Sequence, residues 1–161
     1  MTLRTRLLIA QAPLAIALAV VAVITVVTTR ALGMAGERIL ADNYRSVLAA
    51  QRMKESIERL DSAALFAVIG ERERGLALAR EHRPAFEREI QVEEKNITEP
   101  GEGAAAATLR KAWNAYQADY EAFLGDPGDL RRRYLDVLQP GFLRVKVAAD
   151  DILALNQDAM V

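Results

Sequence analysis

The stretch LLIAQAPLAIALAVVAVITVVTT, Leu7–Thr29, is 23 residues long, apolar and free of formal charge. Arg4 and Arg6 precede it, and Arg30 follows it. An α-helix rises about 1.5 Å per residue, so this stretch is long enough to cross the roughly 30 Å hydrocarbon core of a bilayer. The sequence therefore predicts a transmembrane helix over residues 7–29.

A cleaved signal peptide is the alternative interpretation of the same stretch, because Gly33-Met34-Ala35 resembles a small-x-small cleavage site. The apolar region of a signal peptide runs only about 7–15 residues, which favours an uncleaved anchor here. Arg4 and Arg6 on the short tail favour a cytoplasmic N-terminus. We therefore expect residues 1–6 in the cytoplasm and a domain of residues 30–161 on the other side of the membrane.

The composition excludes several functional classes. The chain of 161 residues has 21 basic and 22 acidic residues, intermixed, and a net charge of −1, so it has no basic face for nucleic acid. Cysteine is absent, which excludes disulfides, thiol catalysis and Cys-ligated metal. His82 is the only histidine and has Ala79 three residues before it, so no Glu-x-x-His pair or catalytic triad can be assembled. We expect no metal, no cofactor and no enzymatic activity.

Beyond Ala31 the apolar residues recur with a helical period, and no strand-like alternation is present. Turn residues divide this part of the sequence at Gly70–Gly75, Thr98–Gly103 and Gly125–Gly128. The pattern predicts helices over residues 31–70, 76–98, 104–124 and 129–160. Four amphipathic helices with short connections predict an all-α, up-down-up-down antiparallel four-helix bundle, continuous with the transmembrane helix.

The apolar seam of each predicted helix follows steps of three and four residues. The first seam contains Tyr44, Val47, Met53, Ile57, Leu60, Ala64 and Ala67. The second contains Leu76, Ala79, Arg83, Phe86, Ile90, Glu93 and Ile97. The third contains Leu109, Trp113, Tyr116, Tyr120 and Phe123, and we expect these large side chains in the core. The fourth contains Leu135, Leu138, Phe142, Val145, Ala149, Ile152, Asn156 and Ala159.

Polar and helix-breaking residues along these seams are candidates for special roles. Asp129 is a candidate cap of the last helix, and Pro84 marks either a kink or a first turn. Pro140 predicts a bend in the last helix. Asn156 occupies an apolar heptad position, either as an amide that fixes the register or as part of a switching layer close to the membrane. Pro140 and Asn156 are therefore the candidate signal-relay residues.

Arg38, Arg45 and Arg52 lie seven residues apart and form one ridge along the first helix. In a homodimer that packs first helix against first helix, this ridge predicts an anion site between subunits, since arginine presents a planar fork to carboxylate, nitrate or phosphate. The alternative is a solvated ridge paired with Asp42 or Glu55.

Two segments resemble a known family. NYRSVLAAQRMKESIERLDSA, Asn43–Ala63, and RRRYLDVLQPGFLRVKVAADDILALNQDAM, Arg131–Met160, resemble the first and fourth bundle helices of the periplasmic sensor region of bacterial membrane sensor histidine kinases of the alginate and nitrogen-regulation type. Chemoreceptors share the arrangement. A second span, a phosphoacceptor histidine segment and an ATP-binding domain do not follow, so the resemblance covers the input module alone.

The resemblance implies an inner-membrane protein with its bundle in the periplasm, acting as the signal-sensing input module of a two-component system. A stimulus, a small molecule or a protein, would change the packing of the first and fourth helices and displace a helix across the membrane. The alternatives are a chemoreceptor-type sensor module and a membrane-anchored scaffold that binds a periplasmic protein.

Overall fold

The computed structural model describes the backbone of residues 3–125 and 128–160 and, within these ranges, all side chains except those of residues 3–10, 12, 35 and 38. The regular elements of these ranges are helices, and none of their residues lies in a strand. The all-α class predicted from the sequence is therefore confirmed. The chain divides into two compact units, an N-terminal segment, Met1–Leu40, and a helical domain, Ala41–Val161.

The N-terminal segment belongs to α1 (Leu3–Val68), which contains Pro13. By length and composition α1 contains one stretch apolar enough to cross a membrane, and none of that stretch is buried in the described structure. A signal sequence has the same properties. The hydroxyls of Thr25 and Thr28 donate to backbone carbonyls four residues earlier, each over 2.9 Å. This pairing suits an apolar solvent, because a hydroxyl without a partner is costly there.

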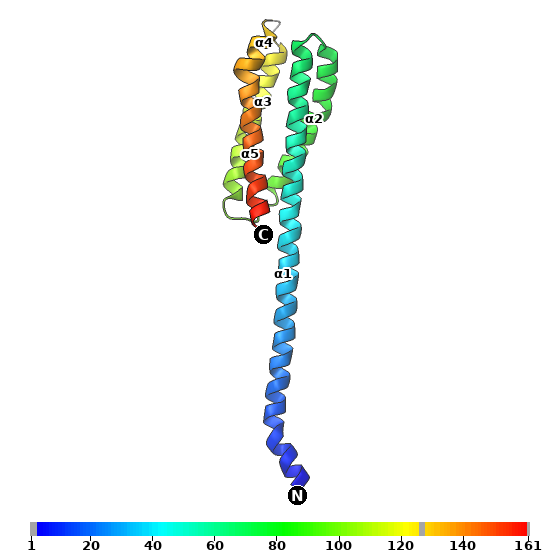
Figure 1. Cartoon of the computed structure of the whole chain (residues 1–161), viewed down its shortest axis with the longest axis vertical. Helices are drawn as coiled ribbons and strands as arrows, with labels where there is room; N and C mark the ends of the chain where they lie inside the picture. The colour runs from blue at the N-terminus through cyan, green and yellow to red at the C-terminus, as the bar shows by residue number, and fades with distance from the viewer. Residues whose placement is uncertain (1–2, 126–127, 161) are drawn as a thin grey trace. The chain divides into compact units, whose positions relative to one another are not determined.

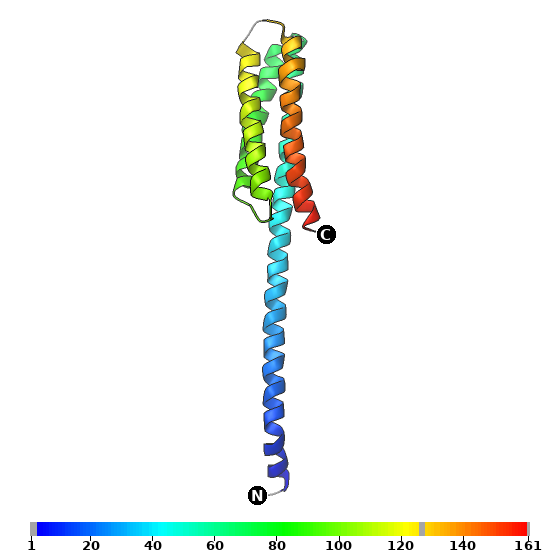
Figure 2. The same ribbon diagram turned by 90° about the vertical axis from the view of Figure 1, so that its left-hand side faces the viewer.

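The helical domain contains the second part of α1 and the helices that follow it. These are α2 (Arg72–Glu94), α3 (Glu102–Gly125), α4 (Leu130–Arg133), the π-helical turn η1 (Tyr134–Leu138) and α5 (Gln139–Asp158). Within the domain α1, α2, α3 and α5 lie side by side in both views (Figure 1 and Figure 2). The contacts that set their directions are Lys54–Asp150 and Glu58–Lys146 between α1 and α5, and Glu94–Arg110 and Arg83–Glu121 between α2 and α3. Each of these two pairs is therefore antiparallel.

All four long helices contribute to one core. Its largest fully buried side chains are Trp113, Tyr116, Tyr120, Phe86, Met53, Ile57, Leu60, Ile90, Leu109, Leu138 and Ile152. The rings of Phe86 on α2 and Trp113 on α3 stack with centroids 4.0 Å apart. The indole nitrogen of Trp113 donates to Glu87 over 2.8 Å, so its polar atom is satisfied at the edge of the core. The expectation that the aromatic seam of the third helix forms core is confirmed.

The connection between α1 and α2 is shorter than predicted. Gly70 has a φ of +93°, a left-handed conformation that suits glycine, and α2 begins two residues later. Gly75, expected in the break, lies buried inside α2. A Cβ atom at Gly75 would come within 2.4 Å of the Ala63 carbonyl oxygen, so this glycine permits the close approach of α1 and α2. Two glycines around four charged residues suggested a loop, but only the first belongs to one.

The other helix boundaries differ from the predictions by a few residues. α2 ends at Glu94, earlier than predicted, and Glu102 opens α3, although it was assigned to the loop. Asp129 caps α4 as predicted, since its side chain accepts from the Arg132 amide over 3.1 Å. Pro84 lies inside α2 and does not begin it. Residues 126 and 127 of the predicted turn lie outside the described residues.

The π-helical turn η1 explains how the last helix accommodates Pro140. The Gln139 amide donates to the Tyr134 carbonyl, five residues earlier, in place of the usual four. The wider turn relieves the clash that a proline ring makes with the carbonyl four residues before it. The extra residue also shifts the seam, so Tyr134 is buried while Leu135, the predicted core residue, is 48 % exposed.

Candidate functional site

Six polar side chains are buried together at one end of the helical domain, and we call this set the polar layer. Its members are Asn43 and Ser46 of α1, Glu93 of α2, Asn96 of the connection after α2, Glu102 of α3 and Asn156 of α5. Each member is at most 7 % exposed. The polar layer therefore replaces apolar core at the level where α1 enters the domain and α5 ends.

Glu102 is the acceptor at the centre of the polar layer. One carboxylate oxygen accepts from the backbone amides of Thr98 and Glu99, over 2.6 and 3.0 Å. The other accepts from the side-chain amide of Asn156 over 2.6 Å. Burial raises the pKa of Glu102, but these donors outweigh it, and the pKa lies below its usual value. Glu102 is thus an ionised carboxylate that joins α3 to α5.

Asn96 and Asn43 join the connection after α2 to α1. The side-chain nitrogen of Asn96 donates to the Asp42 carbonyl over 2.8 Å and to the Ser46 hydroxyl over 2.9 Å. Asn43 accepts from the Thr98 hydroxyl over 2.9 Å and donates to the Glu99 carboxylate over 2.9 Å. The helices α1, α3 and α5 and the connection after α2 therefore meet in one hydrogen-bonded network.

Glu93 is the member of the polar layer without a bond of this kind. It is fully buried, and neither carboxyl oxygen accepts from a backbone or side-chain amide in the part of the chain that the structure describes. Its polar neighbours are the Ser46 hydroxyl and the Glu102 carboxyl. Burial raises the pKa of Glu93 to about 7, opposed by the Ser46 hydroxyl and reinforced by the charge of Glu102. Close to neutral pH this carboxyl therefore exists in both the protonated and the ionised form.

Asn156 is buried as deeply as the core around it. Its nitrogen donates to Glu102 and to the Ile152 carbonyl, the latter over 3.1 Å. Its side-chain oxygen has no donor among the described residues. A buried polar network that is only partly satisfied stabilises one packing less firmly than apolar core does.

The predicted arginine ridge is exposed in this single chain. Arg45 is 58 % exposed and lies 3.4 Å from Asp42, and Arg52 is 56 % exposed and lies 3.5 Å from Glu89. The side chain of Arg38 lies outside the described residues. Arg45 also reaches the polar layer, since it donates to Asn96 over 3.2 Å. The structure thus places an acidic neighbour beside both described members of the ridge.

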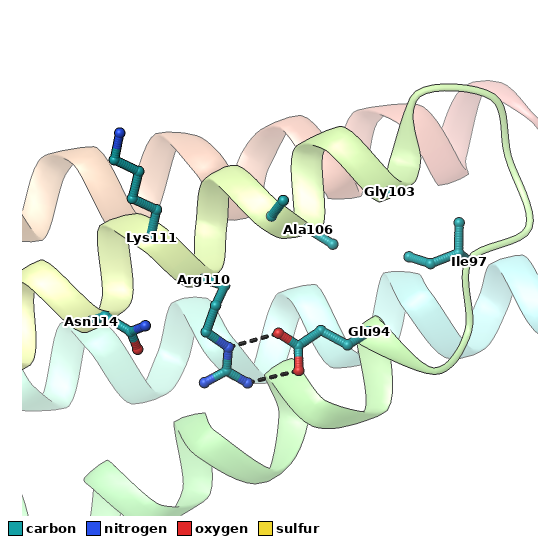
Figure 3. Close-up of a pocket in the computed structure, with 8 residues that line it drawn as sticks. Glu94, Ile97, Gly103, Ala106, Arg110, Lys111 and Asn114 are labelled. Atoms are coloured by element: carbon teal, nitrogen blue, oxygen red, sulfur yellow. Dashed lines mark hydrogen bonds and ion pairs between the residues drawn. The ribbon is translucent and has the colours of Figure 1, made fainter.

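A separate hollow of about 510 Å³ lies beside the connection between α2 and α3 (Figure 3). Arg110 in its wall forms a fork with Glu94, over 2.7 and 2.8 Å, and also donates to Glu87 over 2.7 Å. These carboxylates compensate the guanidinium charge, so Arg110 offers little attraction to an anion. The rest of the wall is formed by Ile97, Gly103, Ala106, Ala107, Lys111 and Asn114.

Among the described residues no group of three or more His, Cys, Asp or Glu side chains is arranged to hold a metal ion.

The sequence identified Asn156 as a polar seam residue, but most of its partners in the polar layer were not predicted. Glu93 was visible as a polar position in the second seam, but its neighbours on the other helices were not predicted. Glu102 continues the third seam at the same step, four residues before Ala106, and this spacing was the available signal.

The first predicted seam is wrong only at its N-terminal residue, for a related reason. Tyr44, predicted in the seam, is 63 % exposed, whereas Asn43 and Ser46 are buried. The buried positions at this end of the helix are polar, so the apolar pattern pointed to the neighbouring tyrosine instead. Ile97 is likewise exposed, and Asn96 takes its place.

Comparisons of the chain with protein-family models, with curated proteins and with solved structures found no match.

Proposed function

We propose that this chain is the input module of a bacterial membrane sensor. In this proposal residues 7–29 span the inner membrane, the N-terminus is cytoplasmic, and the helical domain is an up-down-up-down four-helix bundle in the periplasm. The chain itself has no enzymatic activity, and the output belongs to a histidine kinase core. The observation that carries the proposal is the polar layer, because it joins α1, where that helix enters the helical domain, to the end of α5 through the connection after α2 and through α3.

The physical requirement for a sensor is two packings of similar free energy, one of which the stimulus favours. Apolar core in every layer would stabilise a single packing strongly. The network of Asn43, Glu102 and Asn156 contributes less, because its hydrogen bonds can exchange for bonds to water when the layer opens. This end of α5 is therefore able to move relative to α1.

A second feature that supports movement is the π-helical turn η1 beside Pro140. Short π-helical turns are rare and recur at functional sites. Gly141 packs directly on the Tyr116 ring, where a Cβ atom would approach to 3.2 Å. We propose that α5 pivots at this level, and that Pro140 and Asn156 are the signal-relay residues.

The proposed sensor is a homodimer whose stimulus is a small molecule or a protein, with Arg38, Arg45 and Arg52 as candidate ligand residues between subunits. A chemoreceptor-type module is the nearest alternative, and a scaffold that binds a periplasmic protein is the second. A sensor module of either kind passes a change within the helical domain to an output, whereas a scaffold does not.

A chimera tests the proposal, with residues 1–161 replacing the input region of a histidine kinase that controls a reporter gene. We expect Asn156→Leu to change the basal output several-fold, because it replaces the polar contact to Glu102 with apolar packing. The matched control is Gln157→Leu at the exposed neighbouring position, which should behave as the wild type. Equal output from the wild type and the Asn156→Leu variant would contradict a relay through the polar layer.

Locking the helices provides an independent arm of this experiment. Lys54 of α1 and Asp150 of α5 form an ion pair, and the chain has no cysteine of its own. A Lys54→Cys/Asp150→Cys double variant therefore allows a single disulfide between these helices. We expect oxidation to hold the output at one level and reduction to restore it. An output that is the same in both redox states supports the scaffold alternative.

A further inference from the structure

The polar layer brings two carboxyl groups together in the core of the domain. Glu93 comes from α2 and Glu102 from α3, and both are fully buried. The backbone and Asn156 donors that surround Glu102 are suited to an ionised carboxylate. Glu93 has no backbone or amide donor among the described residues, and its polar neighbours are the Ser46 hydroxyl and the Glu102 carboxyl, which lies within hydrogen-bonding reach. Two ionised carboxylates in this position would repel each other without a counter-charge between them.

We propose that the polar layer is a proton-binding site, in which Glu93 holds one proton next to the ionised Glu102, and that release of this proton loosens the end of the domain where α2, α3 and α5 meet. The ligand is therefore the hydronium ion. This inference deepens the proposed function, on which its role as a stimulus depends.

The two carboxyls have different environments, which decides the position of the proton. Glu102 accepts hydrogen bonds from the amides of Thr98, Glu99 and Asn156, so protonating it would disrupt good contacts. A protonated Glu93 loses its charge and gains an O–H donor, which removes the cost of burying an anion. The direction of the pKa shifts agrees, because the pKa of Glu93 is raised to about 7 and that of Glu102 is lowered.

Release of the proton breaks the O–H bond of Glu93, transfers the proton to water and leaves one more negative charge in the polar layer. The charged groups that contact the layer are Arg45 and Asp42 of α1 and Glu99 of the connection. α5 contributes the neutral Asn156. Arg45 is exposed and already lies beside Asp42, so its charge is screened by solvent. The new charge is therefore relieved by separating α2 from α3, which strains the contact of Asn156 with Glu102.

The first test is a carboxyl titration of the full chain in detergent micelles, with glutamate labelled by ¹³C at the side-chain carboxyl. We expect one glutamate resonance to titrate near pH 7 and to disappear in Glu93→Gln. Glu81→Gln is the matched control, since Glu81 is an exposed glutamate of the same helix. The site is refuted if no glutamate titrates above about pH 6, or if the resonance near pH 7 persists in Glu93→Gln.

Thermal unfolding of the same samples provides the second test, followed by the fluorescence of the buried Trp113. We expect the wild-type melting temperature to fall by on the order of 10 °C between pH 5 and pH 8 and that of Glu93→Gln to fall much less. If Glu93→Gln does not fold, Glu102→Gln replaces it, and the remaining glutamate titration should move to lower pH. A melting temperature that depends on the concentration of Na⁺ or Ca²⁺ at constant pH would assign the layer to a metal cation and overturn the proposal.

The chimera separates this proposal from the function on which it depends. A glutamate that titrates near pH 7 while the output ignores external pH supports the proton site and contradicts its sensing role. The absence of that titration contradicts the proton site and leaves the Asn156→Leu experiment to decide the sensing role.

Discussion

Replacing Gly75 with alanine tests the close approach of α1 and α2, because helix propensity and tertiary packing predict opposite results. Inside a helix, alanine is more favourable than glycine by about 1 kcal/mol. The structure predicts the reverse, since the new Cβ would lie 2.4 Å from the Ala63 carbonyl oxygen and 3.4 Å from the Ala67 amide nitrogen. These contacts are with backbone atoms, so no side-chain rotation relieves them.

The magnitude follows from the displacement that alanine requires. A Cβ atom needs at least about 3 Å from a carbonyl oxygen, so α1 and α2 must separate locally by more than half an ångström. Overpacking of a core costs about 1–3 kcal/mol, from which the propensity gain of about 1 kcal/mol is subtracted. Since the clashes are with backbone atoms, the overpacking cost should lie at the upper end of this range, about 3 kcal/mol, and we expect Gly75→Ala to lower the free energy of unfolding by about 2 kcal/mol.

Thermal unfolding of the full chain in micelles, followed by Trp113 fluorescence, measures this loss, which amounts to a fall of roughly 5 °C in melting temperature. The control is Gly103→Ala in the first turn of α3, where the new Cβ meets only an Ile97 methyl at 3.7 Å. That variant should be as stable as the wild type or slightly more stable. A Gly75→Ala protein that melts at or above the wild-type temperature would contradict the close approach of α1 and α2 at this glycine.

Three further predictions concern stability. Phe86→Ala should cost about 3–5 kcal/mol in chemical unfolding, because the buried ring stacks on Trp113, and a loss below 1 kcal/mol would contradict its place in the core. Asp129→Ala should cost about 1 kcal/mol through the lost cap to Arg132, so unchanged melting would show that the cap is not formed. Since the pKa of Glu102 is lowered from 4.5, its stabilisation should disappear as the pH falls below that value, and Glu102→Gln should show a smaller acid loss than the wild type.

The pH profile of the wild type follows from the two opposite shifts in the polar layer. The raised pKa of Glu93 gives stability that is complete below its unfolded value of 4.5 and is lost as the pH rises through about 7. The lowered pKa of Glu102 gives stability that is present above 4.5 and is lost in acid. The two effects together predict maximal stability near pH 5.

Sequence periodicity was sufficient for the helices but not for their polar ends. The seam residues Met53, Ile57, Phe86 and Ile152 were predicted correctly, because apolar side chains at helical spacing have only the core to occupy. Asn43 and Glu102 could not be recognised in the same way. A polar residue at a seam position looks like part of a solvated face until the partners that satisfy it are known.

Local sequence patterns were enough to predict a helical chain, the helical segments that make up residues 31–160, and the position of the aromatic core of α3. These properties are local, since they follow from the 3.6-residue period, from glycine and proline, and from capping residues such as Asp129. Only the tertiary structure decided the close approach at Gly75, the π-helical turn before Pro140 and the meeting of Glu93 with Glu102. The close approach at Gly75 depends on backbone atoms of another helix. The π-helical turn depends on the backbone beside Pro140. The free energy of the buried carboxyl is set by neighbours that are distant in the sequence.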